Sequence, residues 1–166
     1  VSLALEEYTI FNSSLVGKGK IMQRNYINLG IAVNTNEGLI VPVIKDANNL
    51  NIGQIALEIK ALSDKAKNKK LFTKDLSGGT FTISSLGGIG GTGFTPIINP
   101  PEVGIMGVSK TKTQLSLIED KIVEKILLPF SVSYDHRVIN GVDAGNFVNF
   151  IKETLEKGIT WRKKFW

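Results

Sequence analysis

Cysteine is absent from this 166-residue sequence, and histidine occurs once, as His136. Without cysteine the chain can form no disulfide bond, no thiolate metal site and no covalent intermediate on a cysteine sulfur. With a single histidine as well, a structural zinc site lacks its usual ligands. We therefore expect no metal in this protein, and we expect any acid–base chemistry at neutral pH to involve His136.

Long apolar runs are also missing, since no stretch approaches the roughly 18 residues that a membrane-spanning helix needs. No signal-peptide pattern is present. The length suits one domain, and 42% hydrophobic with 21% charged residues is typical of a globular protein. The net charge of +5 favours anionic partners, either a phosphorylated cofactor or nucleic acid. We expect neither a membrane nor nucleic acid as a partner.

Apolar residues at period two predict strands, and apolar residues three or four apart predict helices. Strands are predicted over 26–33, 39–44, 80–85, 103–109, 114–118, 122–127 and 128–134, and helices over 1–8, 51–70 and 143–156. Pro42 places its strand at an edge or a bulge, because proline cannot donate a ladder hydrogen bond. Asn51 and Gln54 resemble a capping box. Residues 114–127 read as a hairpin about Glu119-Asp120.

Two short motifs point to cofactor chemistry, and we discount both. Gly88 to Gly93 spells G-x-G-x-x-G after a strand, but a dinucleotide site also requires a helix to begin there. Three prolines between residues 94 and 101 exclude that helix, so a tight loop near a backbone or a ligand is predicted.

Asp64-Lys65-Ala66 spells the tripeptide that carries lipoyl groups in lipoyl domains. A lysine that carries a lipoyl group needs to stand at an exposed hairpin tip, whereas Lys65 falls within a helical pattern.

The stretch Phe130–Gly141 carries the best candidates for catalysis. An apolar strand runs into Asp135-His136-Arg137, and Asn140-Gly141 signals a turn. An imidazole with a pKa near 6.5 can take a proton from a thiol, whose pKa is about 8.5. Ser84, on the polar face of its strand, could donate to a developing oxyanion, and Asn140 offers an orienting amide. The alternative is a hydrogen-bonded turn histidine with two ordinary polar residues.

Asp135-His136-Arg137-Val138-Ile139-Asn140-Gly141 closely resembles the D-H-R-x-x-[D/N]-G signature of the dihydrolipoamide acyltransferases. These enzymes form the cores of 2-oxo acid dehydrogenase complexes. The resemblance covers nearly the whole chain and includes the segments Phe11–Leu15, Asn28–Val33, Gly38–Val43, Gly79–Gly88 and Phe94–Val103. Residues 84–103 look most like the branch that serves the pyruvate dehydrogenase complex.

The resemblance implies a chloramphenicol-acetyltransferase-like α/β fold, with a mixed sheet and flanking helices, that forms trimers with active sites between subunits. Acetyl would pass directly between dihydrolipoamide and coenzyme A. His136 would be the general base, Ser84 of the neighbouring subunit would hydrogen-bond the oxyanion, and Asn140 would support the site. Ser85 and Gly88 are our candidates for substrate binding. Many relatives carry aspartate where this chain has Asn140, which leaves its role the least defined.

The same resemblance sets our expectations for domains and partners. Residues 1–166 would be a catalytic domain lacking its N-terminal segment, with the lipoyl and peripheral-subunit-binding domains elsewhere in the polypeptide. Partners would be the lipoyl domain, the E1 and E3 components, and further trimers in a cage of about 24 or about 60 chains. The location would be bacterial cytoplasm, or alternatively mitochondrial matrix. We predict that the aromatic tail Trp161–Trp166 docks into another subunit.

Three other readings remain open. One is a non-catalytic scaffold subunit of the same complex. Another is a related enzyme that transfers a different acyl group. The third is an antibiotic O-acetyltransferase of the same fold, which would share the histidine chemistry.

Overall fold

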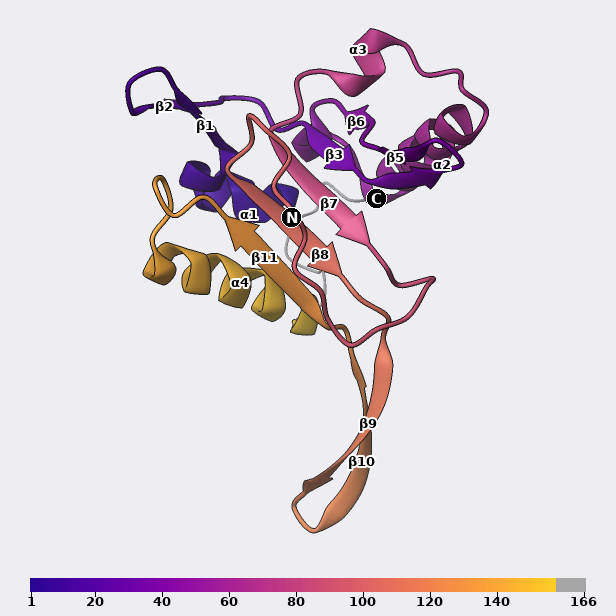
Figure 1. Ribbon diagram of the computed structural model, residues 1–166. Helices are drawn as coiled ribbons and strands as arrows, with labels where there is room; N and C mark the ends of the chain where they lie inside the picture. Colours follow the sequence, from indigo (N-terminus) through magenta and orange to yellow (C-terminus); the bar gives the residue numbers. More distant parts are fainter. Residues whose placement is uncertain (158–166) are drawn as a thin grey trace.

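A five-stranded mixed sheet organises the protein, and the computed structural model describes residues 1–157 (Figure 1). Its strands follow the order β11-β8-β7-β3-β6. Their bounds are β3 Leu29–Ile31, β6 Val43–Ile44, β7 Phe81–Ser85, β8 Gly104–Val108 and β11 Phe130–Tyr134. β3, β7 and β8 run parallel, whereas β6 and β11 are antiparallel to their neighbours. The expected mixed sheet is thus confirmed.

Three two-stranded antiparallel pairs surround this sheet. They are β1 Ser13–Val16 with β2 Lys20–Gln23, β4 Val33–Thr35 with β5 Gly38–Ile40, and β9 Lys112–Ile118 with β10 Lys121–Leu127. The β9–β10 hairpin extends away from the body of the molecule (Figure 1). It turns at Glu119 and Asp120, where the sequence predicts the turn, and both residues have positive φ.

Helices cover the sheet and connect its strands. They are α1 Ser2–Glu7, α2 Ile52–Lys67, α3 Thr73–Leu76 and α4 Gly141–Glu156, with the 3-10 helices η1 Thr9–Asn12 and η2 Ala47–Asn49. The predicted capping box begins α2: Asn51 Oδ1 accepts from Gln54 N at 2.8 Å, and Asn51 N donates to Gln54 Oε1 at 2.9 Å. Within residues 1–157, no helix has the length and apolar character that crossing a bilayer would demand.

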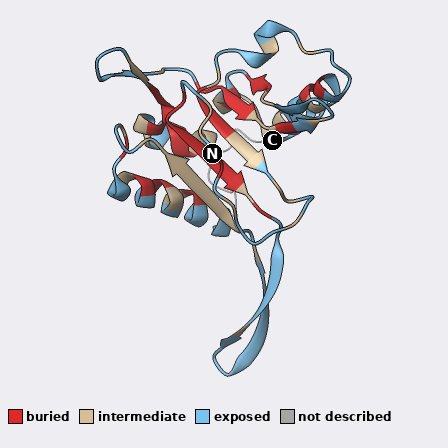
Figure 2. Cartoon of the chain, in the orientation of Figure 1, coloured by how far each residue is buried: buried red, intermediate tan, exposed pale blue. Residues whose placement is uncertain are grey.

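The core lies where α1 and α4 meet the sheet, and buried residues gather there (Figure 2). Phe11 and Phe147 stack with ring centroids 4.0 Å apart, and Phe81 packs 5.8 Å from Phe147. Gly104 lets β8 pass this cluster, because a Cβ there would lie 2.9 Å from the Phe81 ring. Such close packing of large aromatic side chains supplies much of the apolar burial that holds α4 against the sheet.

Several predicted elements are shorter than expected. The run 26–33 yields β3, and a separate strand β4 begins at Val33. The run 39–44 is divided between β5 and β6, since residues 41–42 belong to neither strand. β6 is an edge strand of the main sheet, and Pro42 lies just before it, in the break between β5 and β6 and not within a strand as predicted.

Two helices also bury less of their predicted apolar faces than expected. α2 ends at Lys67, and it buries Leu62 and Ala66, whereas Ile52 remains 50% exposed. In α4, Phe147 and Ile151 are buried as predicted, but Leu155 is 49% exposed. Each helix therefore packs on the body of the protein over only part of its apolar stripe.

Candidate active site

His136 stands in a tight turn directly after β11. Asp135 N donates to Val103 O at 2.8 Å, and Asp135 O accepts from the amides of Val138 and Ile139, both at 3.0 Å. The imidazole is exposed, and its ring centroid lies 5.6 Å from that of Tyr134. The turn thus fixes the backbone on both sides of a histidine whose side chain is open to a ligand.

The charged neighbours of His136 in sequence bind one another. Arg137 Nη2 donates to Asp135 Oδ2 at 2.6 Å, and Arg137 Nε donates to Asp135 Oδ1 at 2.9 Å. These hydrogen bonds hold the pKa of the Asp135 carboxyl below its usual value, and the carboxylate raises the pKa of Arg137. The pair joins the two residues on either side of His136 by charge-assisted hydrogen bonds.

Asn140 caps α4. Its Oδ1 accepts from Asp143 N at 2.9 Å, and its Nδ2 donates to Asp143 Oδ2 at 2.8 Å. An N-cap oxygen satisfies an amide that has no partner within the helix. Asn140 therefore fixes where the turn that carries His136 meets the helix.

Ser84, Ser85 and Gly88 lie together at the end of β7 and the start of the glycine loop, which we define as residues 86–101. Ser84 is half-buried, whereas Ser85 and Gly88 are exposed. Gly87 N donates to Ser85 Oγ at 3.3 Å. No helix begins in residues 86–101, so the interpretation of the glycine run as a loop is confirmed.

Ser84 and His136 lie toward opposite ends of the sheet. Ser84 pairs with Gly107 of β8, whereas Tyr134, two residues before His136, pairs with Gly104. Three residues separate these positions along β8, which is about 10 Å, and two strand spacings add about 10 Å across the sheet. A serine and a histidine side chain cannot span that separation. One chain therefore does not bring its own Ser84 and His136 together.

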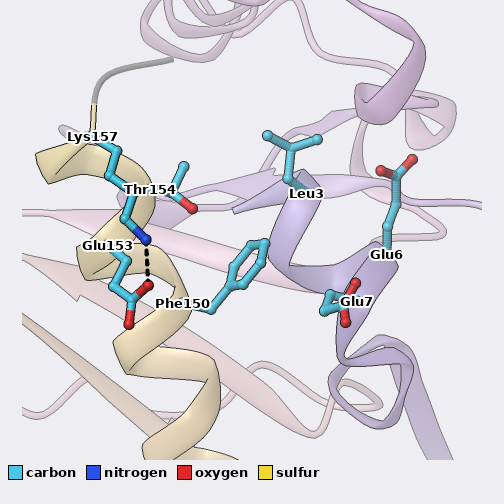
Figure 3. Close-up of a pocket in the computed structure, with 7 residues that line it drawn as sticks. All are labelled: Leu3, Glu6, Glu7, Phe150, Glu153, Thr154 and Lys157. Atoms are coloured by element: carbon cyan, nitrogen blue, oxygen red, sulfur yellow. Dashed lines mark hydrogen bonds and ion pairs between the residues drawn. The ribbon is translucent and has the colours of Figure 1, made fainter. Parts of the chain in front are cut away.

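A groove of about 810 Å³ lies elsewhere, between α1 and α4. Figure 3 shows Leu3, Glu6 and Glu7 on one wall and Phe150, Glu153, Thr154 and Lys157 on the other. Phe150 is ten residues beyond Asn140, about 15 Å along the helix, so the groove is remote from His136. Among residues 1–157, no group of three or more histidine, aspartate or glutamate side chains could hold a metal ion.

The fold is that of the chloramphenicol acetyltransferases. A solved chloramphenicol acetyltransferase superposes with a TM-score of 0.55 at 15% identity, over 91% of this chain. The sequence then defines the family within that fold. The model of the family described as 2-oxoacid dehydrogenases acyltransferase (catalytic domain) matches residues 1–161. The chain belongs to this family.

Relatives at higher identity are acetyltransferase components. The dihydrolipoyllysine-residue acetyltransferase component of the pyruvate dehydrogenase complex from Buchnera aphidicola subsp. Acyrthosiphon pisum is 50% identical over 93% of this chain. This chain spans 39% of that relative. A solved dihydrolipoamide acetyltransferase of Azotobacter vinelandii is 44% identical, with a TM-score of 0.88 over 92% of this chain and 63% of its own. A probable dihydrolipoamide acetyltransferase from Listeria monocytogenes is 36% identical, with a TM-score of 0.89 over 99% of this chain and 70% of its own.

Proposed function

We propose that this chain is the catalytic part of a dihydrolipoamide acetyltransferase, which moves acetyl between the sulfur of dihydrolipoamide and that of coenzyme A. Its relatives are components of pyruvate dehydrogenase complexes, and they support acetyl over other acyl groups. In this role the lipoyl group would arrive on a separate domain. Lys65 is a poor carrier for it, because it lies within α2 with Nζ 4.0 Å from Asp75 Oδ1.

The spacing of three residues supports His136, Ser84 and Asn140 as the catalytic set. The Azotobacter vinelandii study concerns the catalytic roles of a serine, a histidine and an asparagine, with 52 residues from serine to histidine and four from histidine to asparagine. Ser84, His136 and Asn140 have the same spacings. Equal spacing in a chain of the same fold supports a correspondence between these three residues and that set.

The reaction assigns each group one task. His136 accepts the proton of the attacking thiol, and the sulfur adds to the thioester carbonyl carbon. The carbonyl oxygen becomes an oxyanion, to which the Ser84 hydroxyl donates a hydrogen bond. When the carbon–oxygen double bond re-forms, the bond to the other sulfur breaks. The departing thiolate then takes the proton back from His136, so protons and electron pairs balance.

The other residues position these groups. Asn140 acts through the turn, because its amide is bound to Asp143 and not directed by charge at a substrate. Ser85 and Gly88 follow Ser84 along the chain and are exposed, so a bound thioester could approach the backbone there.

Ser84 and His136 are too far apart to act together within one chain. This separation is the observation on which we propose that each active site lies between two subunits. A cyclic trimer provides three such sites, each with the histidine of one chain and the serine of the next. A solved relative, 44% identical with a TM-score of 0.88, forms the cubic core of the pyruvate dehydrogenase complex. We propose the same hierarchy here: trimers assembled into a cage that binds the E1 and E3 components.

The β9–β10 hairpin supports assembly. Side chains on one of its faces remain 68 to 78% exposed, namely Leu115, Leu117, Ile122 and Ile126. Glu124, opposite Leu115, and Thr113, opposite Ile126, lie on the same face. Large exposed apolar patches mark interaction sites in soluble proteins. A second copy of the chain is the occupant that a homotrimer supplies.

Complementation between two inactive variants tests the shared site. Ser84→Ala and His136→Ala are each made in the full-length protein, and each alone should lose about 10²–10⁴-fold in acetyl transfer from acetyl-CoA to dihydrolipoamide. Co-expressed at equal levels, they should form mixed trimers in which about a quarter of the sites pair a wild-type histidine with a wild-type serine. Activity should recover to about a quarter of wild type.

The matched control co-expresses Ser84→Ala with the double variant Ser84→Ala/His136→Ala, which provides no wild-type serine and should stay inactive. Mixed assemblies without recovery would refute the shared site. Wild-type cages that transfer no acetyl would favour the scaffold reading. Faster turnover with another acyl-CoA, or with chloramphenicol in place of dihydrolipoamide, would redirect the substrate assignment.

A further inference from the structure

Glu102 is a buried acid for which the proposed chemistry has no use. Its side chain lies at the entry to β8 and is 6% exposed. Thr82 Oγ1 donates to Glu102 Oε2 at 2.6 Å. Two glycines make room for this contact: a Cβ on Gly79 would lie 2.8 Å from Glu102 Oε1, and one on Gly30 would lie 2.6 Å from Thr82 Oγ1. Two segments thus leave space for one hydrogen-bonded pair.

Burial raises the pKa of the Glu102 carboxyl to about 7, although hydrogen bonds from Thr82 and Asn99 act in the opposite direction. The cations on adjoining segments are bound elsewhere. Arg24 Nη2 lies 3.5 Å from Ser14 Oγ, and Lys45 donates to Ser77 O. Within residues 1–157, Glu102 makes no ion pair. An uncompensated buried carboxylate is costly, so the closed structure favours the neutral acid.

The position of Glu102 connects this contact to the candidate site. The glycine loop leaves the sheet directly after Ser85, where Leu86 N donates to Val108 O at 2.8 Å. It returns through a turn in which Glu102 N donates to Asn99 O at 3.0 Å. Thr82 precedes Ser84 by two residues, so both side chains point to the same face of β7. The Glu102–Thr82 contact therefore fastens the returning end of the loop to the strand that carries Ser84.

We propose that Glu102 is a positioning residue, which ties the glycine loop to β7 through Thr82 and so fixes the loop relative to Ser84. The inference rests on the proposed function only in what Ser84 does; the tie itself is independent of activity. Opening the loop would expose the carboxyl to water, where its pKa returns toward its ordinary value. Linkage then makes opening easier as pH rises, by about tenfold between pH 6 and pH 8.

Hydrogen–deuterium exchange on the full-length assembled protein tests the tie. In Glu102→Ala, amides of residues 86–101 should exchange about tenfold or more faster at pH 7, while those of α2 keep the wild-type rate. Glu102→Gln preserves the shape and hydrogen bonding of the neutral acid, so at pH 7 its residues 86–101 should exchange no faster than those of the wild type. After correction for intrinsic exchange, wild-type opening should rise between pH 6 and pH 8, and that of Glu102→Gln should not.

Thr82→Val and Thr82→Ser provide an independent pair, which also serves if Glu102→Ala does not fold. Valine removes the hydroxyl and should release the loop, whereas serine should retain the tie. Unchanged exchange of residues 86–101 in Thr82→Val, or acceleration equal to that of α2, would overturn the proposal. An acetyl-transfer assay separates the positioning role of Glu102 from the proposed function of the protein. Glu102→Ala should lower kcat about tenfold, and the kcat of Glu102→Gln should be near that of the wild type. A wild-type protein without transfer would refute the function while leaving the exchange result decisive for the tie.

Discussion

Asn140 and Asp143 are joined by two hydrogen bonds in opposite directions at the start of α4. The Asn140 amide oxygen accepts from the backbone of Asp143, and its nitrogen donates to the Asp143 carboxylate. The carboxylate also lies in the first helical turn, where negative charge is favoured. The residue that follows His136 by four positions is therefore part of the helix cap.

Removal of this cap should destabilise the protein. We expect Asn140→Ala to lower the free energy of unfolding by about 1 kcal/mol, because Asp143 N loses its acceptor. Asn140→Ser keeps a capping oxygen and should cost only a few tenths of a kcal/mol. Chemical denaturation of both variants measures the difference. Equal stability of the alanine and wild-type proteins would contradict the capping role.

The apolar face of the β9–β10 hairpin predicts an assembly defect. Leu117→Asp places a charge opposite Ile122 on that face and should shift the protein from oligomer toward monomer in sedimentation experiments. Gln114→Asp places the same charge on the opposite, polar face of β9, and it should leave the mass unchanged. If both variants sediment as the wild type does, the hairpin is not the assembly surface.

Glu102 gives the stability a distinctive dependence on pH. Its folded-state pKa, about 7, lies above the ordinary value of 4.5, so the folded protein binds this proton more tightly than the unfolded chain does. The resulting stabilisation is fully present below pH 4.5 and is lost as pH rises toward 7. The loss should be about 3 kcal/mol.

The comparison with Glu102→Gln isolates this contribution. Asp135 and Glu153, whose pKa values are lowered, give stability that is lost in acid, and they are common to both proteins. The free energy of unfolding of the variant minus that of wild type should therefore increase between pH 4.5 and pH 7 and then level off. A difference independent of pH would show that folding does not raise the pKa of Glu102.

The sequence pattern predicts those structural features that depend only on residues close together in the chain. The capping box of Asn51 and Gln54 and the turn at Glu119-Asp120 appear where the sequence puts them, because each involves residues only a few positions apart. The strand that leads to His136 was likewise evident from alternation, and β11 begins at Phe130. The predicted docking of Trp161–Trp166 lies outside the described residues.

Long-range register could not be read from the same patterns. The distance between Ser84 and His136 depends on β7 pairing in parallel with β8, across a loop that no periodicity constrains.

Glu102 was missed for a related reason. A glutamate after two prolines has no helical or strand signature, and only the packing of Thr82, Gly79 and Gly30 around it makes it a buried acid.

The exposed apolar face of the β9–β10 hairpin favours assembly, but it also favours misfolding while the chain is still folding. β9 and β10 are adjacent in sequence, so they can pair early, before β11 closes against β8. A newly folding chain thus presents an apolar ribbon with two open edges while its own core is incomplete, and such edges template incorrect pairing. High concentration drives the subunits together, but it also promotes these errors. The yield of correctly folded protein should therefore pass through an optimum concentration.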